Sequence, residues 1–225
     1  VLKVLGETSY ASVLTSVSGE GGFDKVLETA LRDAYEEVES FVPDKELVNL
    51  LRLQYDFSNV KVLLKSHFNA RSGGKKRWDL LTSLASYPVD KLISFAEAEE
   101  YQLMPFGLNR LYPKCIAVWE QSKDVLETER LLDNKMYDVM LKEAQALAIP
   151  EILDWVRTRI DGENIRSLMR LKRFEFDASR AAGFMHAGGK IDTDLLTSMI
   201  AEPVETWTRI IDFTDFSPLL GRIDG

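Results

Sequence analysis

Two segments of the chain, 105 residues apart, match one another without a gap. The first covers residues 46–65 (ELVNLLRLQYDFSNVKVLLK) and the second covers residues 151–170 (EILDWVRTRIDGENIRSLMR). A gapless match of this length indicates a duplicated structural unit, and the period is longer than one turn of a common solenoid. We therefore predict two copies of a small domain. Three polar positions are identical in both copies: Arg52 and Arg157, Asp56 and Asp161, Asn59 and Asn164.

The identical positions share one face of a helix. At about 100° per residue, Arg52, Asp56 and Asn59 fall on a narrow stripe within the apolar side of their segment. A buried charge or amide without a partner is costly, so these groups need partners. We expect an ion pair between the Arg and the Asp at i, i+4, and an Asn that bonds the backbone of a neighbouring loop. The second copy, with Arg157, Asp161 and Asn164, predicts the same.

The two polar trios could also position a substrate. However, the same set occurs twice, inside two otherwise apolar helices, and neither copy has a nucleophile or a histidine beside it. Paired buried charges more often specify packing than chemistry. We therefore predict that the six residues are a structural signature.

Length, composition and charge exclude several classes of protein. The chain has 225 residues, 45% of them hydrophobic, and a formal net charge of −8, which argues against a general nucleic-acid binder. No apolar run approaches the roughly 18–20 residues that cross a bilayer, and the first ten residues resemble no signal or transit peptide. The single cysteine, Cys115, fits a reducing compartment.

The periodicity of the chain is helical almost throughout. Apolar residues recur at helical spacing and prolines or glycines separate the runs, whereas sustained period-2 alternation is absent. We predict an all-α fold. The expected helices cover residues 23–42, 46–69, 78–85, 89–104, 109–121, 126–147, 150–174, 178–185, 194–201 and 204–211.

Motifs for catalysis or metal binding are absent from the sequence. The histidines, His67 and His186, lie in different copies, and no metal-ligand spacing, Walker A loop or GxSxG motif occurs. Cys115 lies in an apolar run that is typical of a buried thiol. The basic turn at residues 71–77 and the acidic runs are typical of solvated surface. We predict no catalytic residues, no cofactor and no metal, and four tryptophans in the core: Trp78, Trp119, Trp155 and Trp207.

Several ordered motifs resemble one family. LLRLQYDFSNVKVLLK at residues 50–65 resembles the signature helix of the C subunit of bacterial and archaeal V/A-type rotary ATPases, the relative of the eukaryotic d subunit. RTRIDGENIRSLMR at 157–170 resembles the second copy in that family. The segments GETSYASVL, KMYDVMLKEA and FMHAGGKI resemble family segments in the expected order, at residues 6–14, 135–144 and 184–191.

The resemblance implies a fold and a role. Members of the family are funnel-shaped, all-helical proteins of three pseudo-equivalent domains on the cytoplasmic side of the membrane. They form a socket between the central-stalk subunits and the proteolipid rotor ring. They rotate with the ring, and so couple ATP hydrolysis or synthesis to ion transport without chemistry of their own. We expect this chain to be such a peripheral, non-catalytic subunit.

The pattern also predicts where the domains divide. We expect a first repeat domain at residues 1–110, a second at residues 111–217, and the start of a missing third domain at residues 218–225. A third signature helix has no place before Gly225, and the family's first helix also has no counterpart. We therefore expect a truncated or partly ordered version.

Two other functions remain compatible with the residues. One is a generic α-helical adaptor that binds proteins unrelated to rotary ATPases. The other is a helical hydrolase with an unrecognised carboxylate site, which would need a polar pocket with convergent acids. The contacts with partners have no sequence signature; Lys61, Lys65, Arg166, Arg170 and the basic turn at residues 71–77 are the candidates.

Overall fold

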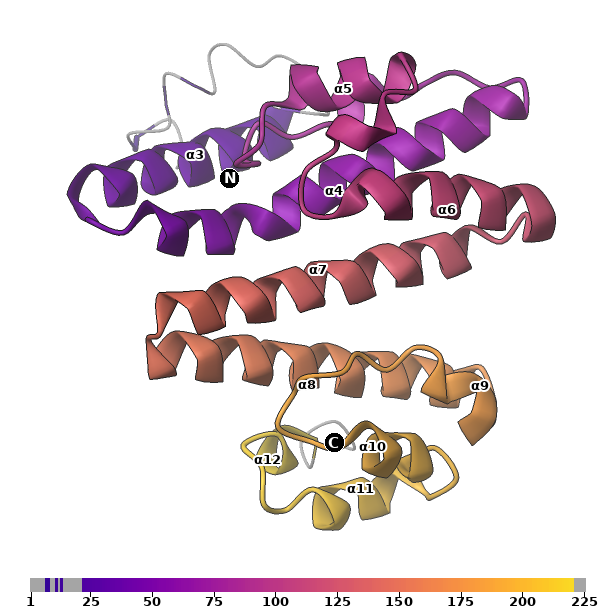
Figure 1. The fold of residues 1–225 in the computed structure, drawn as a ribbon. Helices are drawn as coiled ribbons and strands as arrows, with labels where there is room; N and C mark the ends of the chain where they lie inside the picture. The colour runs from indigo at the N-terminus through magenta and orange to yellow at the C-terminus, as the bar shows by residue number, and fades with distance from the viewer. Residues whose placement is uncertain (1–6, 9–10, 12, 14–21, 221–225) are drawn as a thin grey trace. The chain divides into compact units, whose positions relative to one another are not determined.

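A computed structural model describes residues 7, 8, 11, 13 and 22–220 of the chain. The described part consists of helices and their connections and contains no strand, so the all-α prediction is confirmed (Figure 1). The chain divides into two compact units, residues 1–132 and residues 133–225. The segment at residues 6–14, which carried one of the family motifs, lies mostly outside the described residues.

The first unit is built around its longest helix. α4 (Lys45–Arg71) contributes eleven buried residues, and α3 (Gly22–Phe41), α5 (Val89–Glu97) and α6 (Leu108–Ser122) pack against it. The ring of Phe68 on α4 stacks on the ring of Trp119 on α6, with 4.5 Å between centroids. Two short 3-10 helices, η1 (Trp78–Leu80) and η2 (Tyr101–Leu103), complete the connections.

The second unit repeats the order of a long helix followed by short ones. α8 (Pro150–Arg173) starts with a proline in its first turn, where a missing N–H group is tolerated. It is followed by α9 (Ala178–Ala182), α10 (Thr193–Met199), α11 (Val204–Ile210) and α12 (Ser217–Leu220). Their core contains the fully buried Leu168, Leu196, Met199 and Trp207. α7 (Val125–Leu147) runs through the boundary between the units.

Three of the predicted helices are shorter than expected. The helix expected at residues 78–85 is only η1, because the amides of Thr82, Ser83 and Tyr87 donate to side chains of α3 and α4 instead of to carbonyls of a helix. α5 ends at Glu97, where Glu99 has a φ of 57° and the amide of Glu100 donates to the carbonyl of Phe95. α9 ends at Ala182, and its C-cap residue Gly183 has a φ of −64°.

The tryptophans do not all lie in the core. Trp207 and Trp119 are buried and Trp78 is partly buried, as the apolar periodicity predicts. Trp155 is 37% exposed, and the guanidinium of Arg159 lies 5.5 Å from its ring centroid. The prediction is wrong for Trp155, since apolar spacing on a helix cannot tell a buried position from one that borders a surface pocket.

The two units divide within α7, whereas the duplicated segments predict a division between residues 110 and 111. Compactness and duplication are different criteria, because a helix can belong to one repeat by ancestry and pack partly in the other unit. The domain boundaries at 110 and 217, and the start of a third domain at 218, therefore stay predictions.

Candidate functional site

The signature residues of α4 hold the loop that follows η1. The Asn59 side chain donates to the carbonyl of Thr82 (2.9 Å) and accepts from the amide of Thr82 (2.8 Å). The Asp56 carboxylate accepts from the amide of Tyr87 (2.8 Å) and from the hydroxyl (2.7 Å) and the amide (3.3 Å) of Ser86. Both side chains are fully buried. We call this arrangement of an Asp, an Asn and the loop that they hold a loop clamp.

The signature residues of α8 form a second loop clamp. The Asn164 side chain donates to the carbonyl of His186 (2.8 Å) and accepts from the amide of His186 (2.7 Å). The Asp161 carboxylate accepts from the amides of Lys190 (2.8 Å) and Ile191 (3.2 Å). The predicted bonds from each Asn to the backbone of a neighbouring loop are confirmed in both units.

In the two clamps, the loop residues that bond the Asn and the Asp have the same spacing along the chain. In each loop the Asp bonds the residues four and five places after the one that the Asn holds. The helix residues of the two clamps are 105 positions apart and the loop residues 104, so one residue fewer separates helix and loop in the second copy. This correspondence supports a duplicated unit. The corresponding loop residues are Thr82 and His186, Ser86 and Lys190, and Tyr87 and Ile191.

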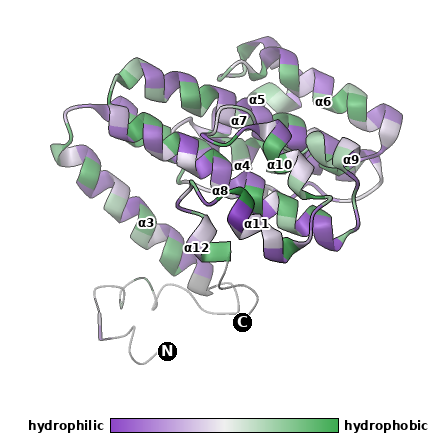
Figure 2. Ribbon diagram, turned by 90° about the horizontal axis from the view of Figure 1, so that it is seen from below, coloured by the Kyte–Doolittle hydropathy of each residue, from purple (hydrophilic) through white to green (hydrophobic). Residues whose placement is uncertain are grey.

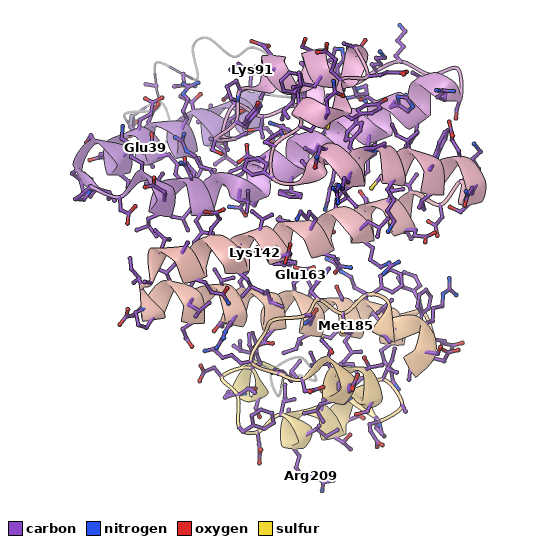
Figure 3. The ribbon with its side chains drawn as sticks, viewed as in Figure 1. Glu39, Lys91, Lys142, Glu163, Met185 and Arg209 are labelled. Carbon is purple, nitrogen blue, oxygen red and sulfur yellow. The ribbon has the colours of Figure 1, made fainter. Side chains whose placement is uncertain are left out.

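The predicted ion pairs between Arg and Asp are wrong. The guanidinium of Arg52 lies 3.6 Å from the carboxylate of Glu39 on α3 and 5.0 Å from the ring centroid of Tyr35 on the same helix. Glu39 is labelled in Figure 3. Arg157 is exposed and makes no ion pair with Asp161. Because the loop amides occupy the carboxylate oxygens of both Asp residues, neither Asp needs a cation for its hydrogen bonds.

Burial and hydrogen bonding act in opposite directions on these carboxyls. Burial raises the pKa of Asp56 and of Asp161 above the ordinary 3.8, and the hydrogen bonds from the loops oppose part of the rise. The folded protein therefore holds a proton on these groups more tightly than the unfolded chain does. Each ionised carboxylate costs stability above its folded pKa, and this cost disappears below the unfolded value near 3.8.

This electrostatic balance predicts how stability depends on pH. Comparison with Asp161→Asn isolates the carboxyl, because the other titrating groups are shared. As the pH falls from 7 toward about 4, the free energy of unfolding of the wild type should rise relative to that of the variant. Urea titrations followed by circular dichroism at several pH values measure the difference. If the free energy of unfolding of the wild type falls relative to that of the variant as the pH falls, the hydrogen bonds affect the pKa of Asp161 more strongly than burial does.

A glycine makes room for the second clamp. A Cβ atom at Gly189 would lie 2.0 Å from Oδ1 of Asp161. The two oxygens of this carboxylate accept hydrogen bonds from two loop amides, Oδ1 from Ile191 and Oδ2 from Lys190. Gly189→Ala should therefore displace the carboxylate and lower the free energy of unfolding by about 2 kcal/mol, because buried donors lose their acceptor. Gly183→Ala is the matched control, since its Cβ would lie 3.5 Å from the nearest atom. Equal stabilities of the two variants in urea titrations would contradict the contact.

Cys115 has the character of an inert core thiol. It is fully buried, its Sγ lies 3.9 Å from the carbonyl of Thr128, and burial raises its pKa to about 12. We expect the native protein to resist a thiol reagent such as DTNB at about pH 8, and the protein unfolded in guanidinium to react at once. Absorbance at the wavelength of the released thiolate measures this. Fast labelling of the native protein would place the thiol at the surface.

The other polar clusters that the structure describes show no catalytic arrangement. No group of three or more His, Cys, Asp or Glu side chains among the described residues could hold a metal ion. A cavity of about 290 Å³ beside His67 brings together Arg71, Lys76, Glu97 and Glu99. Lys76 pairs with Glu97 there, and Arg77 of the same basic turn pairs with Asp79. Arg71 lies 3.8 Å from the carboxylate of Glu120, so three of the four cations of the turn at residues 71–77 have a carboxylate partner.

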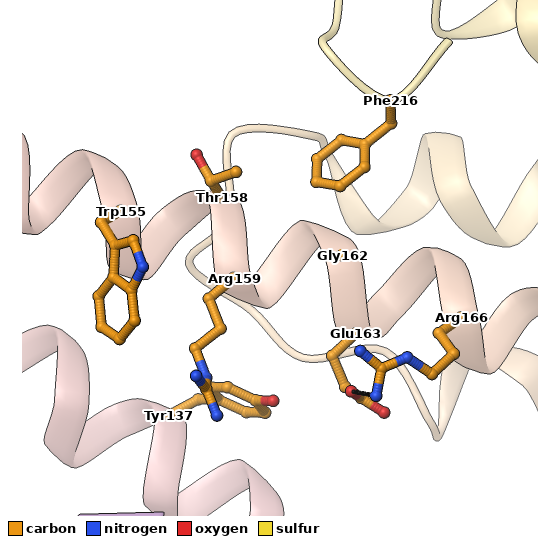
Figure 4. Close-up of a pocket in the computed structure, with 8 residues that line it drawn as sticks. All are labelled: Tyr137, Trp155, Thr158, Arg159, Gly162, Glu163, Arg166 and Phe216. Atoms are coloured by element: carbon orange, nitrogen blue, oxygen red, sulfur yellow. Dashed lines mark ion pairs between the residues drawn. The ribbon is translucent and has the colours of Figure 1, made fainter. Parts of the chain in front are cut away.

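A second cavity, of about 360 Å³, lies in the second unit between α7, α8 and the start of α12 (Figure 4). Trp155 and Phe216 face it from opposite ends, and Tyr137 forms part of its wall. The carboxylate of Glu163 lies 2.9 Å from the guanidinium of Arg166. A single carboxylate that is already paired does not supply the two convergent acids that a hydrolase would need.

Among the described residues, then, the recurring Asp and Asn side chains bind the protein's own loops, whereas the recurring Arg side chains do not. This defines a class of all-helical protein in which the signature residues organise the scaffold. The chain belongs to the family described as "ATP synthase (C/AC39) subunit", whose model matches residues 1–224.

One curated relative fits the same family. The chain is 24% identical over 210 residues to the C subunit of the V-type sodium ATPase of Enterococcus hirae. The match covers 90% of this chain and 62% of that protein, so the chain spans less than two thirds of the relative's length. Among the helices that the structure describes, none combines the length and the apolar character that crossing a membrane requires.

Proposed function

We propose that the chain acts as a non-catalytic central-rotor subunit of a V/A-type rotary ATPase. In this role it is a socket on the cytoplasmic side of the membrane, between the central-stalk subunits and the proteolipid ring. It transmits torque between ATP hydrolysis or synthesis in the soluble head and ion transport in the membrane. The observation that carries the proposal is the family match over residues 1–224.

The loop clamps support a mechanical role. A part that transmits torque has to keep its helices and loops in one register under load. Each clamp crosses from a long helix to a loop more than twenty residues away through buried, fully paired groups. Buried polar groups with all partners in place specify one arrangement, because any slip leaves several of them unpaired. The proposal also includes the duplication: the two predicted repeat domains, at residues 1–110 and 111–217, would be equivalent parts of a larger pseudo-symmetric funnel.

Co-purification tests the assembly. The complete protein, carrying an affinity tag, is expressed in its own host, and membranes are solubilised in a mild detergent. We expect the stalk subunits and the proteolipid ring to be recovered with it and identified by mass spectrometry. An unrelated tagged helical protein is the control. Recovery with other proteins and without ring and stalk would favour a generic adaptor.

A transport assay tests the role as a socket. Membrane vesicles that lack the protein should retain ATP hydrolysis by the head but lose ATP-driven ion uptake, because the ring is no longer turned. Adding back the complete protein should restore uptake. Loss of ATP hydrolysis by the isolated head in its absence would instead indicate a catalytic contribution.

A further inference from the structure

One helix of the first unit has an apolar stripe that the described residues of the unit cover only in part. Leu27, Leu31 and Phe41 on α3 are 47%, 44% and 67% exposed. With Ala34, which is also exposed, and Val38, which is partly buried, they follow a spacing of four, three, four and three residues. This is the heptad pattern of a helix that packs along another helix. We call these five residues the α3 stripe; bands of hydrophobic residues recur along α3 in Figure 2.

Polar contacts already hold α3 in the unit on a different side. Glu28 accepts from the amide (2.7 Å) and the hydroxyl (2.9 Å) of Ser83 in the clamped loop, Tyr35 packs edge-on against Tyr55, and Glu39 faces Arg52. These three residues of α3 lie within an arc of about 40°, and the centre of the α3 stripe is about 100° away round the helix. The residues of α3 that make these contacts therefore lie outside the stripe.

The charge beside the stripe selects its partner. α3 carries six carboxylates and two basic side chains, a net charge of −4. In the described part of the chain neither Asp24 nor Glu37, which border the stripe, forms an ion pair. A second α3 would bring like charges together, and an anionic membrane surface would repel the helix. A helix with apolar residues at heptad spacing and Lys or Arg beside them would complement both features.

We propose that the α3 stripe is the docking site for a basic amphipathic helix of another protein. The stripe runs for about 21 Å, the length of a helical partner of about four turns. Leu27, Leu31 and Phe41 enter the seam, and the carboxylates of Asp24 and Glu37 meet cations of the partner. The proposal does not depend on the rotary ATPase assignment, because it rests on the spacing, exposure and charge of α3 alone.

Two synthetic peptides test this site. Both are helix formers of about 21 residues with Leu at the a and d positions; one carries Lys and the other Glu at the e and g positions. Fluorescence anisotropy with the 225-residue chain should show binding of the Lys peptide, at least about tenfold weaker binding of the Glu peptide, and weakening by salt. Equal affinities, or no binding of the Lys peptide, would overturn the proposal.

Matched variants locate the binding on α3. Leu31→Ser should lower the affinity for the Lys peptide by about tenfold or more, because a buried Leu contact is lost. Glu37→Gln should lower the affinity for the Lys peptide a few-fold and make that affinity less dependent on salt concentration. Leu126→Ser, at a 60% exposed leucine of α7, is the control and should change nothing. Circular dichroism checks that all variants fold. An unaffected Leu31→Ser variant overturns the site.

Two further measurements examine other occupants of the stripe. Light scattering over a range of protein concentrations should show no dimer that depends on Leu31. A dimer that Leu31→Ser abolishes would mean that a second copy of the chain occupies the stripe. Sedimentation with neutral phosphatidylcholine vesicles should show no binding that depends on Leu31. Vesicle binding that Leu31→Ser abolishes would mean that the stripe contacts a membrane. Either positive result overturns the proposal.

Discussion

Asp56→Ala should lower the free energy of unfolding by about 3 kcal/mol, because the amides of Ser86 and Tyr87 lose their acceptor inside the unit. A buried N–H group left without a partner costs about 1–3 kcal/mol, and two are affected here. The whole unit has only about 5–15 kcal/mol of stability, so the loss is a large fraction of it. Urea unfolding followed by circular dichroism measures the change.

The control for this variant lies on the same helix. Ser58→Ala changes an exposed residue two positions away and should alter stability by less than about 0.5 kcal/mol. Arg52→Ala is a second comparison, because Arg52 pairs with Glu39 and not with Asp56. Asp56→Ala should therefore destabilise more than Arg52→Ala. If Arg52→Ala costs as much as Asp56→Ala and the double variant costs no more than either, the two side chains act as a pair and the clamp is misassigned.

Asn164→Ala should lower the stability of the second unit by about 2–4 kcal/mol, since the side chain satisfies both the N–H and the C=O group of His186. Alanine removes the hydrogen bonds that both of these buried groups make with Asn164. Hydrogen exchange of the His186 amide gives a local readout: exchange should become much faster in the variant while amides in the middle of α4 stay protected.

The matched control is Arg166→Ala, two positions along α8. Arg166 is exposed and pairs with Glu163 at the surface, so its removal should cost less than about 1 kcal/mol. Similar losses of unfolding free energy for Asn164→Ala and Arg166→Ala would mean that water replaces the side-chain amide of Asn164 and that this amide does not hold the loop.

Agreement between sequence and structure is best for the helices. Apolar periodicity places α4, α7 and α8 to within a few residues, and Pro150 marks the start of α8. The burial of Asp56, Asn59, Asp161 and Asn164 also follows from their place on an apolar stripe. Local pattern carries this information because helix formation and its apolar face depend on neighbours within one or two turns.

The partners of the signature residues had no such pattern. Asp56 and Asp161 bond backbone amides, and an amide group has no sequence signature, so the expectation of an Arg partner rested on spacing alone. The loop residues of the two clamps correspond only after a shift from 105 to 104 positions, which weakens the match beyond the helices. A search that allowed one deletion after the second signature helix would have aligned Ser86 with Lys190.

The sequence by itself determined the helices, the repeated polar stripe and the family resemblance, since each depends on residue types at fixed spacing along one segment. Only the tertiary structure decided which atoms satisfy the buried carboxylates and that Arg52 turns to α3. It also decided that Trp155 borders a cavity and that the described residues cover the α3 stripe only in part. These outcomes depend on where distant segments meet. A buried polar group takes whichever partner the fold brings within hydrogen-bond distance, and an apolar face is buried only if another element reaches it.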